Sequence, residues 1–137
     1  MRRVTGYSLW IGHVGDVRDP SQLLAAGISA VVDLALNVQP AILPRELVYC
    51  RFPLIDGPGN PRGLVRTAVE TVASLLRSGT PTLVYCGAGM SRSPAVAGAA
   101  IALVRGCSLA EGLVAALQSG PGDVSPGLWA EIEEAMR

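Results

Sequence analysis

Apolar residues along the chain gather in short continuous runs and in longer amphipathic stretches, with polar and turn-forming residues between them. The short runs are rich in valine, leucine and isoleucine, which is typical of buried strands. They cover Tyr7–Ile11, Ser29–Ala35, Leu47–Pro53 and Thr82–Cys86. Strands that alternate with helical segments favour an α/β fold. We therefore predict a three-layer sandwich in which helices flank a central, mostly parallel sheet.

The clearest helical pattern covers Arg62–Ser78. Its apolar residues recur with a period near 3.6, at positions 64, 65, 68, 69, 72, 75 and 76. Arg66 and Glu70 form an i,i+4 pair on the opposite side, and Gly79 provides the stop. Further helices are predicted from Asp19-Pro20 to Gly27, over Arg92–Arg105, from the capping residue Ser108 to Gln118, and over Gly127–Met136.

Composition narrows the class of protein. The 137 residues are 50% hydrophobic, which is enough for one domain with a substantial core. Eleven basic and eleven acidic residues give a formal net charge of zero, so nothing favours a nucleic-acid or membrane-surface partner. Every basic residue is arginine, which excludes a lysine nucleophile. Three cysteines do not form a disulfide framework, and no signal peptide or bilayer-spanning run is visible, so we expect a cytoplasmic protein.

A glycine-rich loop joins the strand that ends at Cys86 to the helix that begins at Arg92. Gly87 and Gly89 allow backbone angles that a side chain would forbid, so the N–H groups that follow Cys86 can curl around an anion. Arg92 brings a planar fork of donors that fits two phosphate oxygens. The same positive field favours the thiolate of Cys86. The predicted phosphate-binding residues are Gly87, Ala88, Gly89, Met90, Ser91 and Arg92.

This loop resembles the signature Cys-x-x-Gly-x-x-Arg-Ser/Thr of the cysteine-based protein tyrosine phosphatase superfamily. The rest of the chain resembles the dual-specificity branch of that superfamily, in Leu9–Gly12, in Leu23–Ala35 and in Phe52–Asp56. The resemblance implies one catalytic domain over residues 1–137, a monomer, that needs no metal or cofactor. It also implies hydrolysis of phosphate monoesters, either small molecules or phosphotyrosine, phosphoserine and phosphothreonine on proteins.

The resemblance assigns four catalytic residues. Cys86 is the nucleophile, and Arg92 binds the phosphate together with the loop N–H groups. Asp56 protonates the leaving oxygen and then acts as a base for the attacking water. Ser93 hydrogen-bonds the sulfur and helps it leave. The alternative reading of Asp56 is a plain turn residue before Gly57-Pro58. Its position at the end of a strand, 30 residues before Cys86, is typical of the resembled family and so favours the acid. Weaker acid candidates are Asp16, Asp19 and Asp33.

One residue departs from the family pattern. The family usually has histidine immediately before the nucleophilic cysteine, whereas this chain has Tyr85, which carries no positive charge. Slower catalysis at neutral pH is the expected consequence. Tyr85 therefore leaves open a pseudophosphatase that binds phosphorylated partners without turnover. A rhodanese-like sulfur-transfer domain also has a cysteine in an anion-binding loop, but the span from Cys86 to Arg92 and the separate acid Asp56 fit it less well. The single histidine, His13, is read as a polar residue in the loop after the first strand.

The other polar and reactive side chains are predicted to have structural roles. Cys50 and Cys107 are expected in the core, and Cys50 is placed to form a disulfide with Cys86 if their strands lie side by side. Arg62 and Arg66 are expected on the solvated face of their helix, with the pocket rim as the alternative. RNA and phosphoinositide substrates are disfavoured by the balanced charge.

Overall fold

The computed structural model describes residues 1–137 and contains one five-stranded sheet with the strand order β1-β2-β5-β3-β4. The strands are β1 (Arg2–Arg3), β2 (Leu9–His13), β3 (Ala30–Ala35), β4 (Val48–Leu54) and β5 (Thr82–Cys86). All neighbouring pairs are parallel except β1 with β2, which is antiparallel. The predicted mostly parallel sheet is confirmed.

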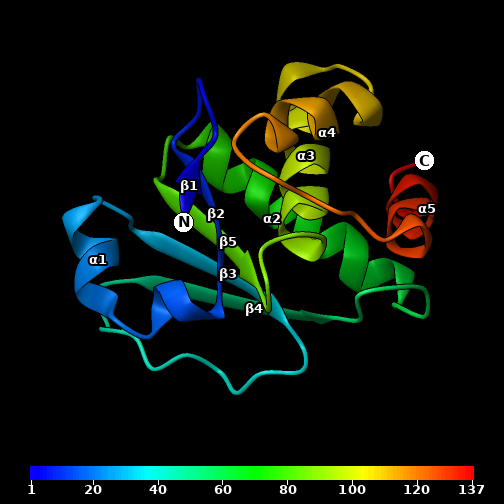
Figure 1. Ribbon diagram of the computed structural model, residues 1–137. Helices are drawn as coiled ribbons and strands as arrows, with labels where there is room; N and C mark the ends of the chain where they lie inside the picture. The colour runs from blue at the N-terminus through cyan, green and yellow to red at the C-terminus, as the bar shows by residue number, and fades with distance from the viewer.

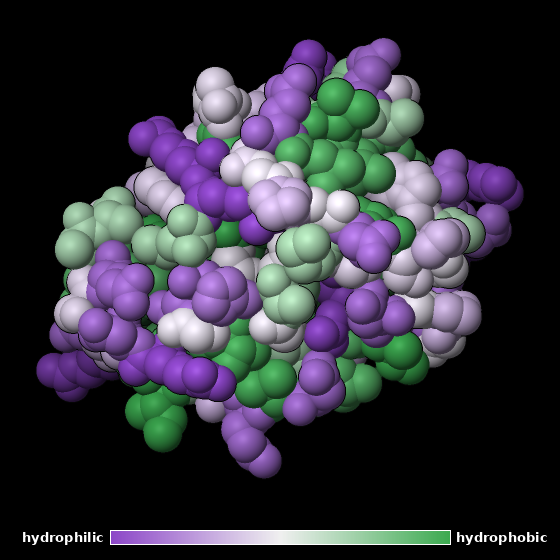
Figure 2. Space-filling model, viewed as in Figure 1, coloured by the Kyte–Doolittle hydropathy of each residue, from purple (hydrophilic) through white to green (hydrophobic).

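Helices cover both faces of this sheet (Figure 1). The 3-10 helix η1 (Val14–Val17) and helix α1 (Pro20–Ala25) lie on one face. On the other face lie α2 (Arg62–Arg77), α3 (Arg92–Arg105), α4 (Leu109–Leu117) and α5 (Pro126–Ala135). Two hydrophobic clusters fill the two layers between sheet and helices. The predicted three-layer sandwich is therefore confirmed. On the face shown in Figure 2, hydrophobic residues are interspersed with hydrophilic ones.

Burial explains why the central elements carry so few polar residues. All six residues of β3 and all five of β5 are buried, because both strands lie inside the sheet with helices on both sides. Helix α3 is buried from Arg92 to Ala102, as its nearly uniform apolar surface predicts. None of the helices combines the length and the apolar character needed to cross a bilayer.

Local capping signals place the helix starts as predicted. The Asp19 carboxylate accepts a hydrogen bond from the N–H of Ser21 at the start of α1. The Ser108 hydroxyl accepts a 3.1 Å hydrogen bond from the N–H of Glu111 at the start of α4. Arg66 and Glu70 form the expected ion pair at 2.8 Å. These contacts join residues at most four positions apart, so the sequence alone can predict them.

Other expectations were wrong at the sheet. The first long strand begins at Leu9 rather than Tyr7. The short strand β1 and the 3-10 helix η1 carry no apolar pattern that predicts them. Strand β3 lies between β4 and β5, so Cys50 and Cys86 are not on adjacent strands and the proposed disulfide partnership fails. All three cysteines are free, and Cys50 and Cys107 are half-buried rather than fully inside the core.

Candidate active site

Cys86 is the last residue of β5, and its side chain is almost completely buried at the start of α3. The Sγ atom lies 3.2 Å from the Ser93 hydroxyl oxygen, and the N–H of Ser93 points at the sulfur from 3.4 Å. Both groups belong to Ser93 in the first turn of α3, where the helix dipole favours negative charge. The sulfur therefore sits in surroundings that suit a thiolate.

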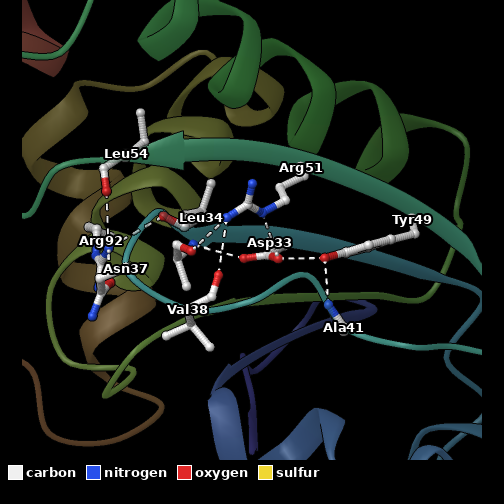
Figure 3. A network of polar contacts seen from close by, with 10 residues as sticks. Asp33, Leu34, Asn37, Val38, Ala41, Tyr49, Arg51, Leu54 and Arg92 are labelled. Atoms are coloured by element: carbon white, nitrogen blue, oxygen red, sulfur yellow. Dashed lines mark hydrogen bonds and ion pairs between the residues drawn. The ribbon is translucent and has the colours of Figure 1, made fainter.

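The Arg92 guanidinium is held by the ends of two strands (Figure 3). Its Nη1 donates to the carbonyl oxygen of Leu54 and to Oδ1 of Asn37, both at 3.0 Å. The Nε atom of Arg92 is buried and has no hydrogen-bond partner in the protein. The Nη2 group of Arg92 also donates to no acceptor in the protein, so Arg92 is fixed in place through Nη1 while Nε and Nη2 remain available as donors.

The loop between Cys86 and Arg92 is shaped by its two glycines in different ways. Gly89 has φ +72°, and a Cβ there would meet the carbonyl oxygen of Gly12 at 2.8 Å. Gly87 does not have a positive φ, so the expectation that both glycines need special backbone angles was wrong for Gly87. Instead, a Cβ on Gly87 would lie 3.1 Å from Nη2 of Arg92. Gly87 therefore provides space for the arginine.

The carbonyl groups of the loop accept hydrogen bonds from the surrounding structure. Gly89 accepts from Nη2 of Arg2 at 2.9 Å, Met90 from the N–H of Asp123 at 2.7 Å, and Gly87 from the N–H of Val14 at 3.4 Å. By contrast, the N–H groups of residues 87 to 92 donate to no acceptor in the protein. A row of free N–H groups beside a fixed arginine is the arrangement that binds a phosphate.

Asp56 follows the end of β4 by two residues and lies against the loop. Its Oδ1 accepts a 2.6 Å hydrogen bond from the hydroxyl of Ser91, which in turn accepts one from the N–H of Ser125 at 2.8 Å. Asp56 and Arg92 line one cavity of about 310 Å³ together with Leu36, Asn37, Leu54 and Ile55. The structure thus places Asp56 and Arg92 at one cavity, and it places Ser93 against Cys86 at the start of α3. Cys86 and Ser93 do not line that cavity.

Comparison with known proteins gives the family. The chain is 30% identical over 131 residues to "Dual specificity phosphatase 28" of Homo sapiens, covering 93% of this chain and 73% of that protein. This chain belongs to the dual specificity phosphatases. It is also 31% identical over 128 residues to "Dual specificity protein phosphatase 15" of Rattus norvegicus, and it spans about half (53%) of that relative's length. No family model matches the sequence.

Solved structures agree with this membership. The crystal structure of human DUSP28 superposes with a TM-score of 0.85 and 27% identity, over 98% of this chain and 94% of that chain. The crystal structure of DUSP15 superposes with a TM-score of 0.81 and 26% identity, over 98% of this chain and 85% of that chain. The α/β phosphatase fold inferred from the sequence is therefore shown by sequence and by structure.

The residue before the nucleophile lies on the other face of the sheet. Tyr85 is buried there beside Asp33, which is its neighbour across the β3–β5 pair. Burial, and then the Asp33 carboxylate, raise the pKa of Tyr85 far above its usual value. Tyr85 therefore stays a neutral phenol and supplies no positive charge next to Cys86.

The weaker acid candidates lie outside the cavity that contains Asp56. The carboxylate of Asp33 accepts from the Tyr49 hydroxyl at 2.6 Å and lies 3.3 Å from Nε of Arg51. Asp16 accepts from the amino group of Met1 at 3.0 Å and from the N–H of His13 at 2.9 Å. Asp19 caps α1. Each of these carboxylates has a structural partner.

Three polar contacts at the site were not anticipated from the sequence. Asn37 orients Arg92, Ser91 contacts Asp56, and Arg2 anchors the loop through Gly89. The sequence could have identified Asn37 as a site residue, because it lies just past the carboxyl end of a buried parallel strand, where ligand-binding residues gather. No sequence pattern could have identified Arg2 as a site residue, since it lies 87 positions away from Gly89.

The remaining polar residues take structural positions. His13 is the last residue of β2, where it pairs with Cys86, so its predicted place in the loop after that strand was wrong. Its Nδ1 accepts from the N–H of Gly15 and caps η1. Arg62 and Arg66 lie on the outer face of α2, near Glu134 and Glu70, and neither lines the cavity. Nowhere do three or more His, Cys, Asp or Glu side chains gather closely enough to hold a metal ion.

Proposed function

We propose that this chain hydrolyses phosphate monoesters through a cysteinyl-phosphate intermediate. The observation that carries the proposal is the loop after Cys86, whose N–H groups have no acceptor in the protein. The buried Nε of Arg92 is likewise unpaired. Buried polar groups without partners are rare in folded proteins, and a bound phosphate would satisfy these donors together.

In the first step the Cys86 thiolate attacks phosphorus and the bond from phosphorus to the leaving oxygen breaks. Asp56 in its acid form gives its proton to that oxygen, so an alcohol or phenol departs. Arg92 and the loop N–H groups stabilise the charge on the transferring phosphoryl group. The support for this step is that Asp56 and Arg92 line the same cavity.

In the second step a water molecule attacks phosphorus and the sulfur–phosphorus bond breaks. The Asp56 carboxylate takes the proton of the water, which regenerates the acid for the next turnover. The departing thiolate is stabilised by the Ser93 hydroxyl, which lies 3.2 Å from the sulfur. Inorganic phosphate is the product.

The proposed substrates are phosphotyrosine and also phosphoserine and phosphothreonine on proteins, or small phosphomonoesters. Two apolar side chains at the cavity, Leu36 and Ile55, are 48% and 43% exposed, and they suit the ring of an aryl phosphate. The proposal takes residues 1–137 as one catalytic domain that acts as a cytoplasmic monomer without nucleic-acid or membrane partners. Its support is the balanced charge and the three free cysteines.

A second function is favoured by one observation, the neutral Tyr85 beside the nucleophile. With less stabilisation of the thiolate, the same loop would bind phosphorylated partners without turning them over. The alternative therefore shares the site and differs in the rate of the chemical step.

Turnover of p-nitrophenyl phosphate and of a phosphotyrosine peptide tests the proposal. We expect activity in the unchanged protein and none in Cys86→Ser, which should still bind tungstate. Tungstate binding without any turnover in the unchanged protein would support the pseudophosphatase. Thiosulfate turnover without phosphatase activity would instead support sulfur transfer.

A further inference from the structure

A second cavity lies between the sheet and the segment after β3. Its volume is about 330 Å³, which is within the range of small-molecule sites. Six of the nine residues around it are hydrophobic. They come from η1, from the segment 38–42 and from β5, which contributes Tyr85. The cavity shares no residue with the one that contains Asp56 and Arg92.

The segment 37–42 connects this cavity to the phosphate loop (Figure 3). At one end, Oδ1 of Asn37 accepts the hydrogen bond from Arg92. The next five residues, 38 to 42, all line the second cavity. Their backbone is held at two points, since Val38 accepts from Arg51 at 3.1 Å and Ala41 donates to the Tyr49 hydroxyl at 2.9 Å. A molecule that packs against this segment therefore acts on the partner of the phosphate-binding arginine.

Tyr85 is a second connection. Successive side chains of a strand point to opposite faces of the sheet. Tyr85 lines the second cavity, whereas the next residue, Cys86, faces the helix layer of α3. The nucleophile is thus one peptide bond from this cavity.

The chemistry of the lining indicates the ligand. Arg18 is exposed and lacks an ion-pair partner. The neighbouring carboxylates are occupied, since Asp16 binds the Met1 amino group, Asp19 caps α1 and Asp33 lies against Arg51. No carboxylate lines the cavity, and the apolar side chain of Ile42 is 94% exposed at its edge. A ligand that has an apolar part and a single negative charge would match the residues that line this cavity.

We infer that this cavity is an effector site for a small monoanionic amphiphile, whose acidic group pairs with Arg18 and whose occupancy tightens oxyanion binding at the phosphate loop. An occupied cavity holds residues 38–42 against the sheet and so favours the Asn37–Arg92 contact. The binding claim is independent of the proposed function, whereas its consequence for catalysis rests on that function.

Fluorescence titration with anilinonaphthalene sulfonate tests the site. We expect saturable binding of one molecule per chain in the unchanged protein. Ala41→Phe fills the cavity and should abolish binding, whereas Ala130→Phe, an equal change on the exposed surface of α5 away from any cavity, should not. Circular dichroism and thermal unfolding check that Ala41→Phe is folded. Absence of saturable binding, or equal binding in both variants, contradicts the inference.

The proposed pairing of the ligand's acidic group with Arg18 is tested by substituting this exposed residue. Arg18→Gln should weaken binding of the sulfonate roughly two- to fivefold, the range of an exposed ion pair. It should leave the uncharged N-phenylnaphthylamine unaffected. The matched control is Arg77→Gln, which changes another exposed arginine that has no ion pair and lines no cavity. An equal loss for both probes refutes the role of Arg18. Affinity that falls as protein concentration rises shows that a second copy occupies the cavity instead.

Coupling is tested with tungstate at the phosphate loop. Saturating tungstate should increase affinity for the sulfonate, and the sulfonate should increase affinity for tungstate by the same factor, on the order of fivefold. Asn37→Ala should remove this coupling while preserving binding of the sulfonate. Independent binding of the two ligands refutes the effector role. Because tungstate binding needs no turnover, a failed phosphatase assay leaves this test intact, and failed probe binding leaves the proposed phosphatase intact.

Discussion

The hydroxyl of Ser91 donates a 2.6 Å hydrogen bond to Oδ1 of Asp56, which ties the proposed acid to the phosphate loop. The same hydroxyl accepts from the N–H of Ser125, so Ser91 is itself held by the start of α5. The position of Asp56 over the loop therefore depends on a residue that follows Cys86 by only five positions.

Ser91→Ala should slow the reaction in a way that depends on the leaving group. Without its hydrogen bond, Asp56 is less well placed to give a proton, and a poor leaving group needs that proton most. We expect kcat to fall about tenfold for an alkyl phosphate and less for p-nitrophenyl phosphate. Asp56→Asn should show the same pattern more strongly. Equal losses for both substrates would indicate that Ser91 supports the loop rather than the acid.

Arg2 should support the phosphate loop from the edge strand. It donates to Gly89 and Pro121, and its Nε donates to Ser119 at 3.2 Å. Burial lowers the pKa of Arg2, and the proximity of Cys86 and Asp16 opposes that shift. Arg2→Met should weaken tungstate binding and kcat/KM roughly fivefold, with partial rescue by Arg2→Lys. The matched control is Arg3→Met.

Arg3 is a suitable control because it contacts Tyr7 and the ring of Trp10 rather than the loop. A loss of thermal stability in both variants, without a specific loss of tungstate binding in Arg2→Met, would assign Arg2 a purely structural role.

Tyr85→His should raise activity below neutral pH. An imidazole at this position would lie beside the Asp33 carboxylate, which favours its charged form. The added positive charge next to Cys86 favours the thiolate, so kcat/KM near about pH 6 should rise on the order of tenfold. Tyr85→Phe removes the hydroxyl without adding charge and should show no such gain. Equal rates in the two variants would contradict this account.

Asp16 should contribute pH-dependent stability. Burial alone would raise its pKa, but the hydrogen bonds from His13 N–H and the Met1 amino group outweigh burial and lower the pKa below 3.8. The stabilisation is therefore fully present above pH 3.8 and is lost as the pH falls through the lower folded value. Urea unfolding should show Asp16→Asn to be about 1 kcal/mol less stable at neutral pH, with a gap that narrows in acid.

Asp19→Asn is the control for this prediction. Asparagine caps a helix about as well as aspartate, so its stability should differ little from the unchanged protein. A stability gap for Asp16→Asn that stays constant down to strongly acidic pH would exclude the ionised carboxylate as its source.

Two glycines allow α3 and α4 to approach closely. A Cβ on Gly98 would lie 2.7 Å from the Cα of Leu113, and one on Gly112 would lie 2.9 Å from the N atom of Ala102. Either change to alanine should cost about 1–3 kcal/mol, because neither backbone can yield locally. Gly63→Ala in α2, where a Cβ has open space, should instead be neutral or stabilising. Thermal unfolding of the three variants distinguishes these outcomes.

The sequence alone determined the elements and the chemistry that depend on local order. Buried runs predicted β3 and β5, capping residues predicted the starts of α1 and α4, and the loop from Cys86 to Arg92 predicted an anion site. Each of these signals lies within one strand, one helical turn or one loop, so neighbours in sequence are also neighbours in space.

The tertiary structure decided which distant residues surround that loop. The strand order places β3 between β4 and β5, which separates Cys50 from Cys86 and brings Asp33 beside Tyr85. It also brings Arg2, Asn37 and Asp56 to one loop from three separate segments. Such contacts follow from how strands pair and helices pack, and no local pattern specifies them. The sequence alone therefore predicts the anion-binding loop. The residues that hold the loop in place, and the cavity beside residues 38–42, can be identified only in the folded chain.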